Sequence, residues 1–215
     1  MRDFFYRTGR AVLRIFFTIV CRIEVVNPDK IPSKGSVVLA ANHLSYLDPL
    51  VILVSLKRRP TFMAKESLFG VPVIGAFVRT FSFPVRRGRP RPSTFREALD
   101  RLKSGGLVVI FPEGGLSADG SRLDAKRGVG MIAAMSGSRI VPVLLDGTER
   151  ALPVGARCVR PAKIRVTFGD PVEVSRRGTG RVYHEGITQD IMKVIEGLRR
   201  GRTGAPGGHR SLTSG

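Results

Sequence analysis

The sequence SVVLAANHLSYLDPLVILVSL at residues 36–56 decides the fold class. It starts with an apolar run that predicts a short buried strand, and the residues from Pro49 to about Leu56 predict a helix with proline in its first turn. A polar turn lies between them, with His43 five positions before Asp48. A strand that leads through a polar turn into a helix is the unit from which α/β folds are built.

The same alternation of strand and helix continues along the chain. Apolar runs that end in turns predict strands within residues 60–70, 107–115, 139–147 and 163–172, and the last of these alternates like a strand nearer an edge. Helices are expected within residues 94–106, 126–137 and 186–200. We therefore expect an α/β fold with a largely parallel central sheet flanked by helices.

The N-terminal segment, residues 1–24, predicts an amphipathic helix. One face carries three arginines spaced three and four apart, Arg7, Arg10 and Arg14. The opposite face is aromatic and aliphatic and consists of Phe5, Val12, Phe16, Ile19 and Val20. This pattern is typical of a helix in a membrane interface, although a first helix that buries its apolar face on the domain has the same pattern. The longest uninterrupted apolar run, IFFTIV at residues 15–20, is too short to span a bilayer.

Three regions are expected on this basis. Residues 1–24 form the membrane-interface helix, residues 25–200 form one domain, and residues 201–215, GRTGAPGGHRSLTSG, form a disordered tail. The two cysteines, Cys21 and Cys158, are far apart and in no metal or redox spacing, which favours a reducing compartment. The expected location is therefore peripheral, at the cytoplasmic face of the cell membrane.

The net charge of +19 predicts an anionic partner. Nucleic acid, an anionic membrane surface and a phosphorylated substrate all satisfy it, so charge alone does not decide. A nucleic-acid surface normally interleaves basic residues with exposed aromatics. This chain has no Trp and three Tyr, and most of its aromatic residues lie in apolar runs. Nucleic acid is therefore not the expected partner.

The histidine in the first polar turn has two interpretations. Asp48 before Pro49 suits a helix N-cap, which is worth roughly 1 kcal/mol. A second role, compatible with capping, is that Asp48 orients His43 as a general base, because a carboxylate that accepts from one ring N–H leaves the other nitrogen to take a proton. On one regular helix, residues five apart point about 140° apart, so this contact requires a non-helical turn.

Metal and covalent chemistry are not expected. The other histidines, His184 and His209, are distant in sequence, so a zinc site is improbable. The chain contains no G-x-S-x-G nucleophile elbow.

Two motifs together carry a resemblance to a known family. Asn42, His43 and Asp48 form N-H-x-x-x-x-D, and residues 111–114 form F-P-E-G. In this order, each after a predicted strand, they resemble the glycerolipid acyltransferase family, which includes the bacterial 1-acylglycerol-3-phosphate acyltransferases. Three further segments agree: FSFPVRR with Phe83 and Arg86, IVPVLLDG around Pro142, and AKESL with Lys65. The resemblance spans roughly residues 25–175.

The resemblance implies a reaction. His43, held by Asp48, deprotonates the hydroxyl of a lysophospholipid, which attacks the thioester of acyl-CoA or acyl-carrier protein without an acyl-enzyme or a cofactor. The residues implied in substrate binding are Asn42, Lys65, Phe83, Arg86, Glu113 and Gly114. Of these, Lys65 and Arg86 match positions expected to meet the acceptor phosphate, which suits cations.

One departure bears on the acceptor. Members that act on glycerol phosphates usually read E-G-T-R-S, whereas this chain has Leu116 where the arginine would be. Arg87, Arg122 or Lys126 could replace it. The first expectation is 1-acylglycerol 3-phosphate, giving phosphatidic acid. Another lysophospholipid or a glycolipid acceptor stays open, as does a non-catalytic basic protein that binds membrane or nucleic acid.

Overall fold

A seven-stranded sheet forms the centre of the molecule, in the order β1-β7-β6-β2-β5-β3-β4. The computed structural model describes residues 2–70, 75, 78–85, 92–116, 124–174 and 180–200. The strands are β1 (Glu24–Val26), β2 (Val37–Ala41), β3 (Pro60–Lys65), β4 (Ser82–Val85), β5 (Leu107–Ile110), β6 (Arg139–Asp146) and β7 (Arg165–Phe168). All neighbouring pairs are parallel except β6 and β7. The predicted α/β fold with a largely parallel sheet is therefore confirmed.

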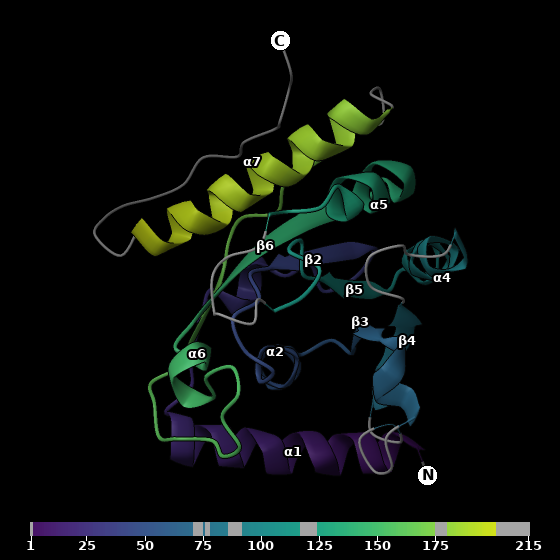
Figure 1. Ribbon diagram of the computed structural model, residues 1–215. Helices are drawn as coiled ribbons and strands as arrows, with labels where there is room; N and C mark the ends of the chain where they lie inside the picture. Colours follow the sequence, from purple (N-terminus) through teal and green to yellow (C-terminus); the bar gives the residue numbers. More distant parts are fainter. Residues whose placement is uncertain are drawn as a thin grey trace.

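Helices cover both faces of this sheet (Figure 1). The helices α1 (Arg2–Cys21), α2 (Asp48–Ser55) and α6 (Thr148–Ala151) pack on one face. The other face is covered by α4 (Pro92–Lys103), α5 (Gly128–Ser136) and α7 (Arg181–Arg200). Two short 3₁₀ turns, η1 (Pro28–Lys30) and η2 (Glu66–Gly70), follow β1 and β3. The expected disordered tail, residues 201–215, lies outside the described residues.

The central strand β2 supplies side chains to both halves of the core. Val37, Leu39 and Ala41 join the cluster under α1 and α2, whereas Val38 and Ala40 join the cluster under α4, α5 and α7. All five residues are buried. A strand covered on both faces needs apolar residues at every position, which explains the continuous apolar run in the sequence.

Helix α1 does not pack on the domain through the aromatic and aliphatic face that the sequence suggested. It packs through a different face. Phe17 and Cys21 are buried in the core, and Arg10 donates hydrogen bonds to the carbonyls of Leu53 and Leu56 at the end of α2. Arg14 Nη1 lies 3.5 Å from Val54 O. Arginine suits this position because the last carbonyls of a helix lack partners within the helix and carry partial negative charge.

The outward face of α1 is apolar. Its large exposed hydrophobic residues, 38–73% accessible, are Phe4, Val12, Ile15, Phe16 and Ile19. The expectation that this apolar face is not buried on the domain holds for Val12, Phe16 and Ile19, while Val20 is half-buried. Two residues of the basic stripe, Arg10 and Arg14, contact carbonyl groups at the end of α2, whereas Arg7 is exposed. None of the helices in the described ranges is both long and apolar enough to cross a bilayer.

The contact between α5 and α7 depends on Gly130. Its backbone N–H donates to Thr188 Oγ1 at 3.1 Å, and a Cβ atom at this position would lie 2.2 Å from His184 O. We expect Gly130→Ala to lower the free energy of unfolding by about 1–3 kcal/mol, because the two helices must move apart. Urea unfolding followed by circular dichroism measures this.

Gly186→Ala on α7 is the matched control. A Cβ atom there meets nothing within 4 Å. This variant should be neutral or more stable by up to about 1 kcal/mol, since alanine has the higher helix propensity. Equal stability of the two variants would contradict the close packing of α5 on α7.

Candidate active site

The polar turn between β2 and α2 brings His43 and Asp48 together. His43 Nδ1 lies 2.8 Å from Asp48 Oδ2, and the two side chains are 7% and 0% exposed. Asp48 is the first residue of α2, and the N-cap position belongs to Leu47, which makes no side-chain cap hydrogen bond. The N-cap interpretation of Asp48 is therefore wrong. Its carboxylate turns back over the preceding residues instead of binding the N–H groups of the helix.

Asp48 Oδ2 also accepts hydrogen bonds from the backbone of the turn. Leu44 N donates to it at 2.6 Å and Ser45 N at 2.8 Å. The chain must leave helical geometry over these residues to aim both N–H groups at one oxygen, which is the non-helical turn that the spacing requires. With Asp48 accepting from Nδ1–H, the tautomer that fits leaves the lone pair of His43 on Nε2.

The turn after β5 holds His43 from the other side. Glu113 Oε2 accepts from His43 N at 2.6 Å, and the Phe111 ring stacks on the imidazole with centroids 4.1 Å apart. These residues meet because β2 and β5 are paired in parallel, with Ala40 opposite Ile110, so both turns leave the same edge of the sheet. Gly114 follows with φ of 71°, a conformation that favours glycine.

Asn42 anchors the start of the turn to β6. Its Nδ2 donates to Leu145 O at 2.9 Å, and Leu145 N donates to its Oδ1 at 2.7 Å. Asn42 is 2% exposed, so its amide is committed to the backbone of β6. A contact of Asn42 with substrate, which the resemblance implied, stays a prediction. The structure gives Asn42 the role of positioning the turn that carries His43.

Ser45 is a further residue of the turn that sequence reasoning did not single out. Its hydroxyl donates to Leu152 O at 2.8 Å and accepts from Leu47 N at 3.2 Å. Ser45 is fully buried, and its hydroxyl proton is bound to Leu152 O, so this serine stabilises the turn and is not presented as a nucleophile. The only feature of the sequence that could have indicated this role of Ser45 is its position two residues after His43.

The remaining predicted residues have different positions. Lys65 is exposed at the carboxyl end of β3, on the same edge of the sheet as His43. Phe83 is 4% exposed in the core, with the Arg101 guanidinium 5.5 Å from its ring centroid. Core packing accounts for Phe83, and a contact with substrate stays a prediction for both residues. Arg86 lies outside the described residues.

This arrangement suits proton abstraction. A buried carboxylate orients one neutral imidazole, and Phe111 covers one face of the ring, so Nε2 is the nitrogen left to accept a proton from a hydroxyl. The described residues contain no group of three His, Cys, Asp or Glu side chains that could hold a metal ion.

Comparison with known proteins gives consistent similarities. A family model described as "Acyltransferase" matches residues 22–146. A chloroplastic 1-acyl-sn-glycerol-3-phosphate acyltransferase of Arabidopsis thaliana is 31% identical over 160 residues, which cover 72% of this chain and 45% of that protein. The 1-acyl-sn-glycerol-3-phosphate acyltransferase of Bacillus subtilis is 28% identical over 169 residues, covering 78% of this chain and 82% of that protein.

A solved structure is similar as well. The crystal structure of the 1-acyl-sn-glycerophosphate acyltransferase of Thermotoga maritima superimposes with a TM-score of 0.76 and 25% identity. The match covers 96% of this chain and 83% of that one. The chain thus spans about half the length of the chloroplastic relative (45%) and most of the bacterial ones (82% and 83%).

Asn42→Ala tests the anchor on β6. The change leaves Leu145 N and Leu145 O buried without their partner, and we expect a loss of about 1–3 kcal/mol of unfolding free energy for each group. Chemical denaturation measures it. Gln189→Ala, which truncates an exposed amide on α7, is the control and should stay within about 0.5 kcal/mol of the wild type. A loss no larger than that of the control would show that the amide pairing does not stabilise the turn.

Proposed function

The chain belongs to the acyltransferase family, and from this we propose that it transfers a fatty acyl group from a thioester to a lysophospholipid hydroxyl. The donor is acyl-CoA or acyl-carrier protein. The acceptor is 1-acylglycerol 3-phosphate, and the product is phosphatidic acid. The observation that carries the proposal is the contact of His43 Nδ1 with Asp48 Oδ2 at 2.8 Å, beside the F-P-E-G turn.

The reaction needs one proton transfer in each direction. Nε2 of His43 takes the proton of the acceptor hydroxyl while its oxygen attacks the carbonyl carbon of the thioester, and the Asp48 carboxylate stabilises the imidazolium that forms. The C–S bond then breaks, and the thiolate takes the proton from Nε2. The new C–O bond is an ester, and the histidine returns to its neutral state. No acyl-enzyme is required, in agreement with the engagement of Ser45 Oγ by Leu152 O.

The acceptor assignment rests on the relatives and on charge. The relatives named above are called 1-acylglycerol-3-phosphate acyltransferases, and Lys65 is an exposed cation at the edge of the sheet that carries His43. We assign Lys65 and Arg86 to the acceptor phosphate, and the turn that contains Glu113 and Gly114 to binding of the acceptor beside the catalytic pair. Leu116 in place of an arginine makes another lysophospholipid or a glycolipid the second candidate acceptor.

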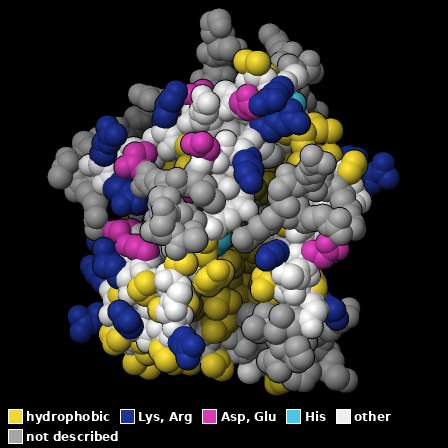
Figure 2. Space-filling model, viewed as in Figure 1, with side chains coloured by type: hydrophobic (Ala, Val, Ile, Leu, Met, Phe, Trp, Pro, Cys, Tyr) yellow, Lys and Arg dark blue, Asp and Glu magenta, His cyan; other side chains and the backbone are white. Residues whose placement is uncertain are grey.

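A membrane surface is the proposed location of the reaction. The exposed large apolar residues of α1 form one face, here called the α1 apolar face: Phe4, Val12, Ile15, Phe16 and Ile19. Figure 2 shows hydrophobic side chains gathered over α1, with a hollowed hydrophobic strip leading from there toward the middle of the molecule. We assign the α1 apolar face to the bilayer interface of an anionic membrane, because a chain with net charge +19 is attracted to that surface.

The protein would then be peripheral, at the cytoplasmic face of the cell membrane. The free thiol of Cys158 is exposed, which fits a reducing compartment. Acceptor and product are both membrane lipids, so docking α1 places the enzyme where its substrate is.

The activity is tested by thiol release from palmitoyl-CoA with a panel of acceptors in detergent micelles. We expect release that depends on 1-acylglycerol 3-phosphate and falls by at least about a hundredfold in His43→Ala, because the general base is lost. Asp48→Asn should lose activity to a similar degree if the carboxylate orients the ring.

His184→Ala, a histidine on α7 outside the site, is the control and should keep full activity. Acceptor-dependent release that survives in His43→Ala would contradict the mechanism, and release with none of the acceptors would contradict the function.

Membrane docking is tested by sedimentation with vesicles that contain anionic lipid. Ile15→Gln combined with Ile19→Gln removes two residues of the α1 apolar face, 59% and 73% exposed, without changing charge. We expect binding to weaken by at least about tenfold, since each buried isoleucine contributes about 1.5–3 kcal/mol. Point variants are preferable to deletion of the helix because Phe17 belongs to the core.

Val182→Gln on α7, where valine is 83% exposed, is the matched control and should bind as the wild type does. Equal binding by the α1 double variant would rule out the apolar face as the anchor.

A further inference from the structure

The F-P-E-G turn lacks the arginine of related acyltransferases, but a lysine from the next described segment lies against it. The backbone of Lys126 is tied to this turn, because Lys126 N donates to Pro112 O at 2.8 Å. Lys126 is thereby held just before α5, two residues ahead of its first residue, Gly128. A cation fixed to this turn by its own backbone is a candidate for the missing charge.

The side chain of Lys126 lies over Gly114. A Cβ atom on Gly114 would be 3.2 Å from Lys126 Nζ and 3.2 Å from its Cδ. Glycine at position 114 therefore serves two purposes: it adopts φ of 71°, and it leaves the space that the lysine chain occupies. Gly114 is next to Glu113, whose carboxylate binds His43 N at 2.6 Å. The ammonium thus lies on the same loop that supports the histidine.

Among the described residues, the ammonium of Lys126 has no ion-pair partner. A nearby cation, Arg181, is in an ion pair with Glu185 at 2.7 Å. Within the described ranges no carboxylate lies within ion-pair distance of Lys126 Nζ, and the side chain is exposed. Glu113, in the turn that Lys126 contacts, directs Oε2 to His43 N.

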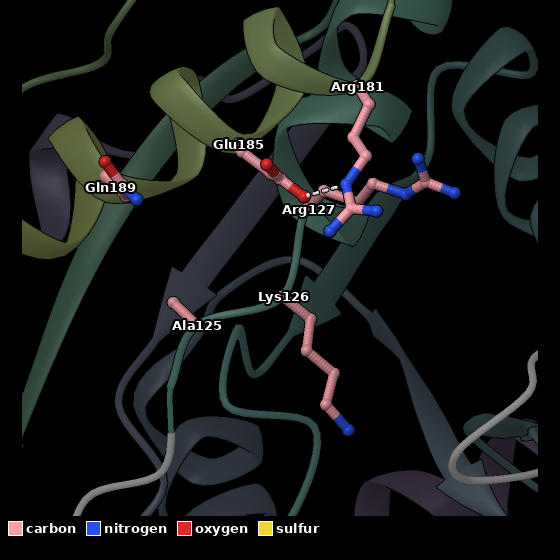
Figure 3. Close-up of a pocket in the computed structure, with 6 residues that line it drawn as sticks. All are labelled: Ala125, Lys126, Arg127, Arg181, Glu185 and Gln189. Carbon is pink, nitrogen blue, oxygen red and sulfur yellow. Dashed lines mark hydrogen bonds and ion pairs between the residues drawn. The ribbon is translucent and has the colours of Figure 1, made fainter.

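The view of the pocket between α5 and α7, of about 440 Å³, shows where Lys126 points (Figure 3). Arg127, Arg181 and Glu185 gather on one side of it, whereas the Lys126 side chain extends away from them. Its charge is therefore directed away from the ion pair of Arg181 and Glu185. Lys126 therefore differs from its neighbour Arg127: its side chain lies over Gly114 and points away from the ion pair of Arg181 and Glu185.

We propose that Lys126 binds the phosphate of the acceptor, in the place that Leu116 leaves without a cation. The inference rests on the proposed function and deepens it. In 1-acylglycerol 3-phosphate the free hydroxyl and the phosphate are on adjacent carbons. A ligand with its hydroxyl at His43 Nε2 therefore has its phosphate close by, and Lys126 lies against the turn whose Glu113 binds His43 N. A hydrogen bond between ammonium and phosphate is charge-assisted, which makes it stronger than a neutral one.

The test measures binding rather than turnover. Isothermal titration calorimetry of the full chain carrying His43→Ala, with a monomeric short-chain 1-acylglycerol 3-phosphate, gives a dissociation constant without reaction. Adding Lys126→Met should weaken binding by about ten- to a hundredfold, the range expected for loss of one hydrogen bond to a charged group. Lys126→Arg should bind within about threefold of the lysine form, because it keeps the charge.

Lys57→Met is the matched control. Lys57 is exposed and precedes β3, at the edge of the sheet opposite His43. The substitution removes the same charge as Lys126→Met. It should leave the dissociation constant unchanged. The monoacylglycerol of the same chain length lacks the phosphate, so its binding should be the same with and without Lys126→Met.

The outcomes separate this inference from the proposed function. Equal affinity of the Lys126→Met and lysine forms overturns the inference, as does absence of binding altogether. A loss of affinity in Lys57→Met or in Lys126→Arg as large as that in Lys126→Met overturns it too. If thiol release by the wild type depends on 1-acylglycerol 3-phosphate but binding ignores Lys126, the function stands and the inference fails. If binding depends on Lys126 and the wild type releases no thiol, the phosphate site stands and the proposed reaction fails.

Discussion

The site depends on the burial of one carboxylate. Asp48 is fully buried, and a buried carboxylate is costly unless hydrogen-bond donors surround it. Its donors are the N–H groups of Leu44 and Ser45 and the ring of His43, all within five residues. The chain can aim all three at Oδ2 only by turning back over the start of α2. The three hydrogen bonds to Oδ2 therefore also fix the orientation of the imidazole, while Oδ1 is buried without a hydrogen-bond partner among the described residues.

The parallel sheet supplies the rest of the support. Because β2, β5 and β6 are neighbours, the turn after β5 reaches His43 from one side and the backbone of β6 holds Asn42 from the other. The histidine is thus fixed through its ring by Asp48 and Phe111 and through its backbone by Glu113. General-base catalysis benefits from this rigidity, since a base misplaced by a fraction of an ångström loses alignment with the proton it accepts.

Sequence patterns predicted the parts of this structure that local chemistry determines. The alternation of apolar runs and helical spacing gave the α/β sheet, and the spacing of His43 and Asp48 required the turn that is observed. Patterns could not predict the structural role of Asn42, because its hydrogen-bond partner Leu145 is 103 residues away in the sequence. Nothing in the local sequence indicates which backbone groups a buried amide will bind. They also could not orient α1, since Arg10 can bind lipid headgroups as well as the carbonyls at the end of α2. Of the three candidate cations, Arg87 and Arg122 lie outside the described residues, and Lys126 is the one for which the structure describes a backbone contact with Pro112.

The most direct test of the account is the tautomer of His43, measured by ¹⁵N NMR on histidine-labelled protein at a pH where the ring is neutral. With Asp48 accepting from Nδ1–H, the account predicts a proton on Nδ1 and a lone pair on Nε2, and it predicts that Asp48→Ala abolishes this preference while His184 stays unchanged. A proton on Nε2 of His43 in the wild type would contradict it, because the nitrogen that has to accept the proton of the hydroxyl would already carry one.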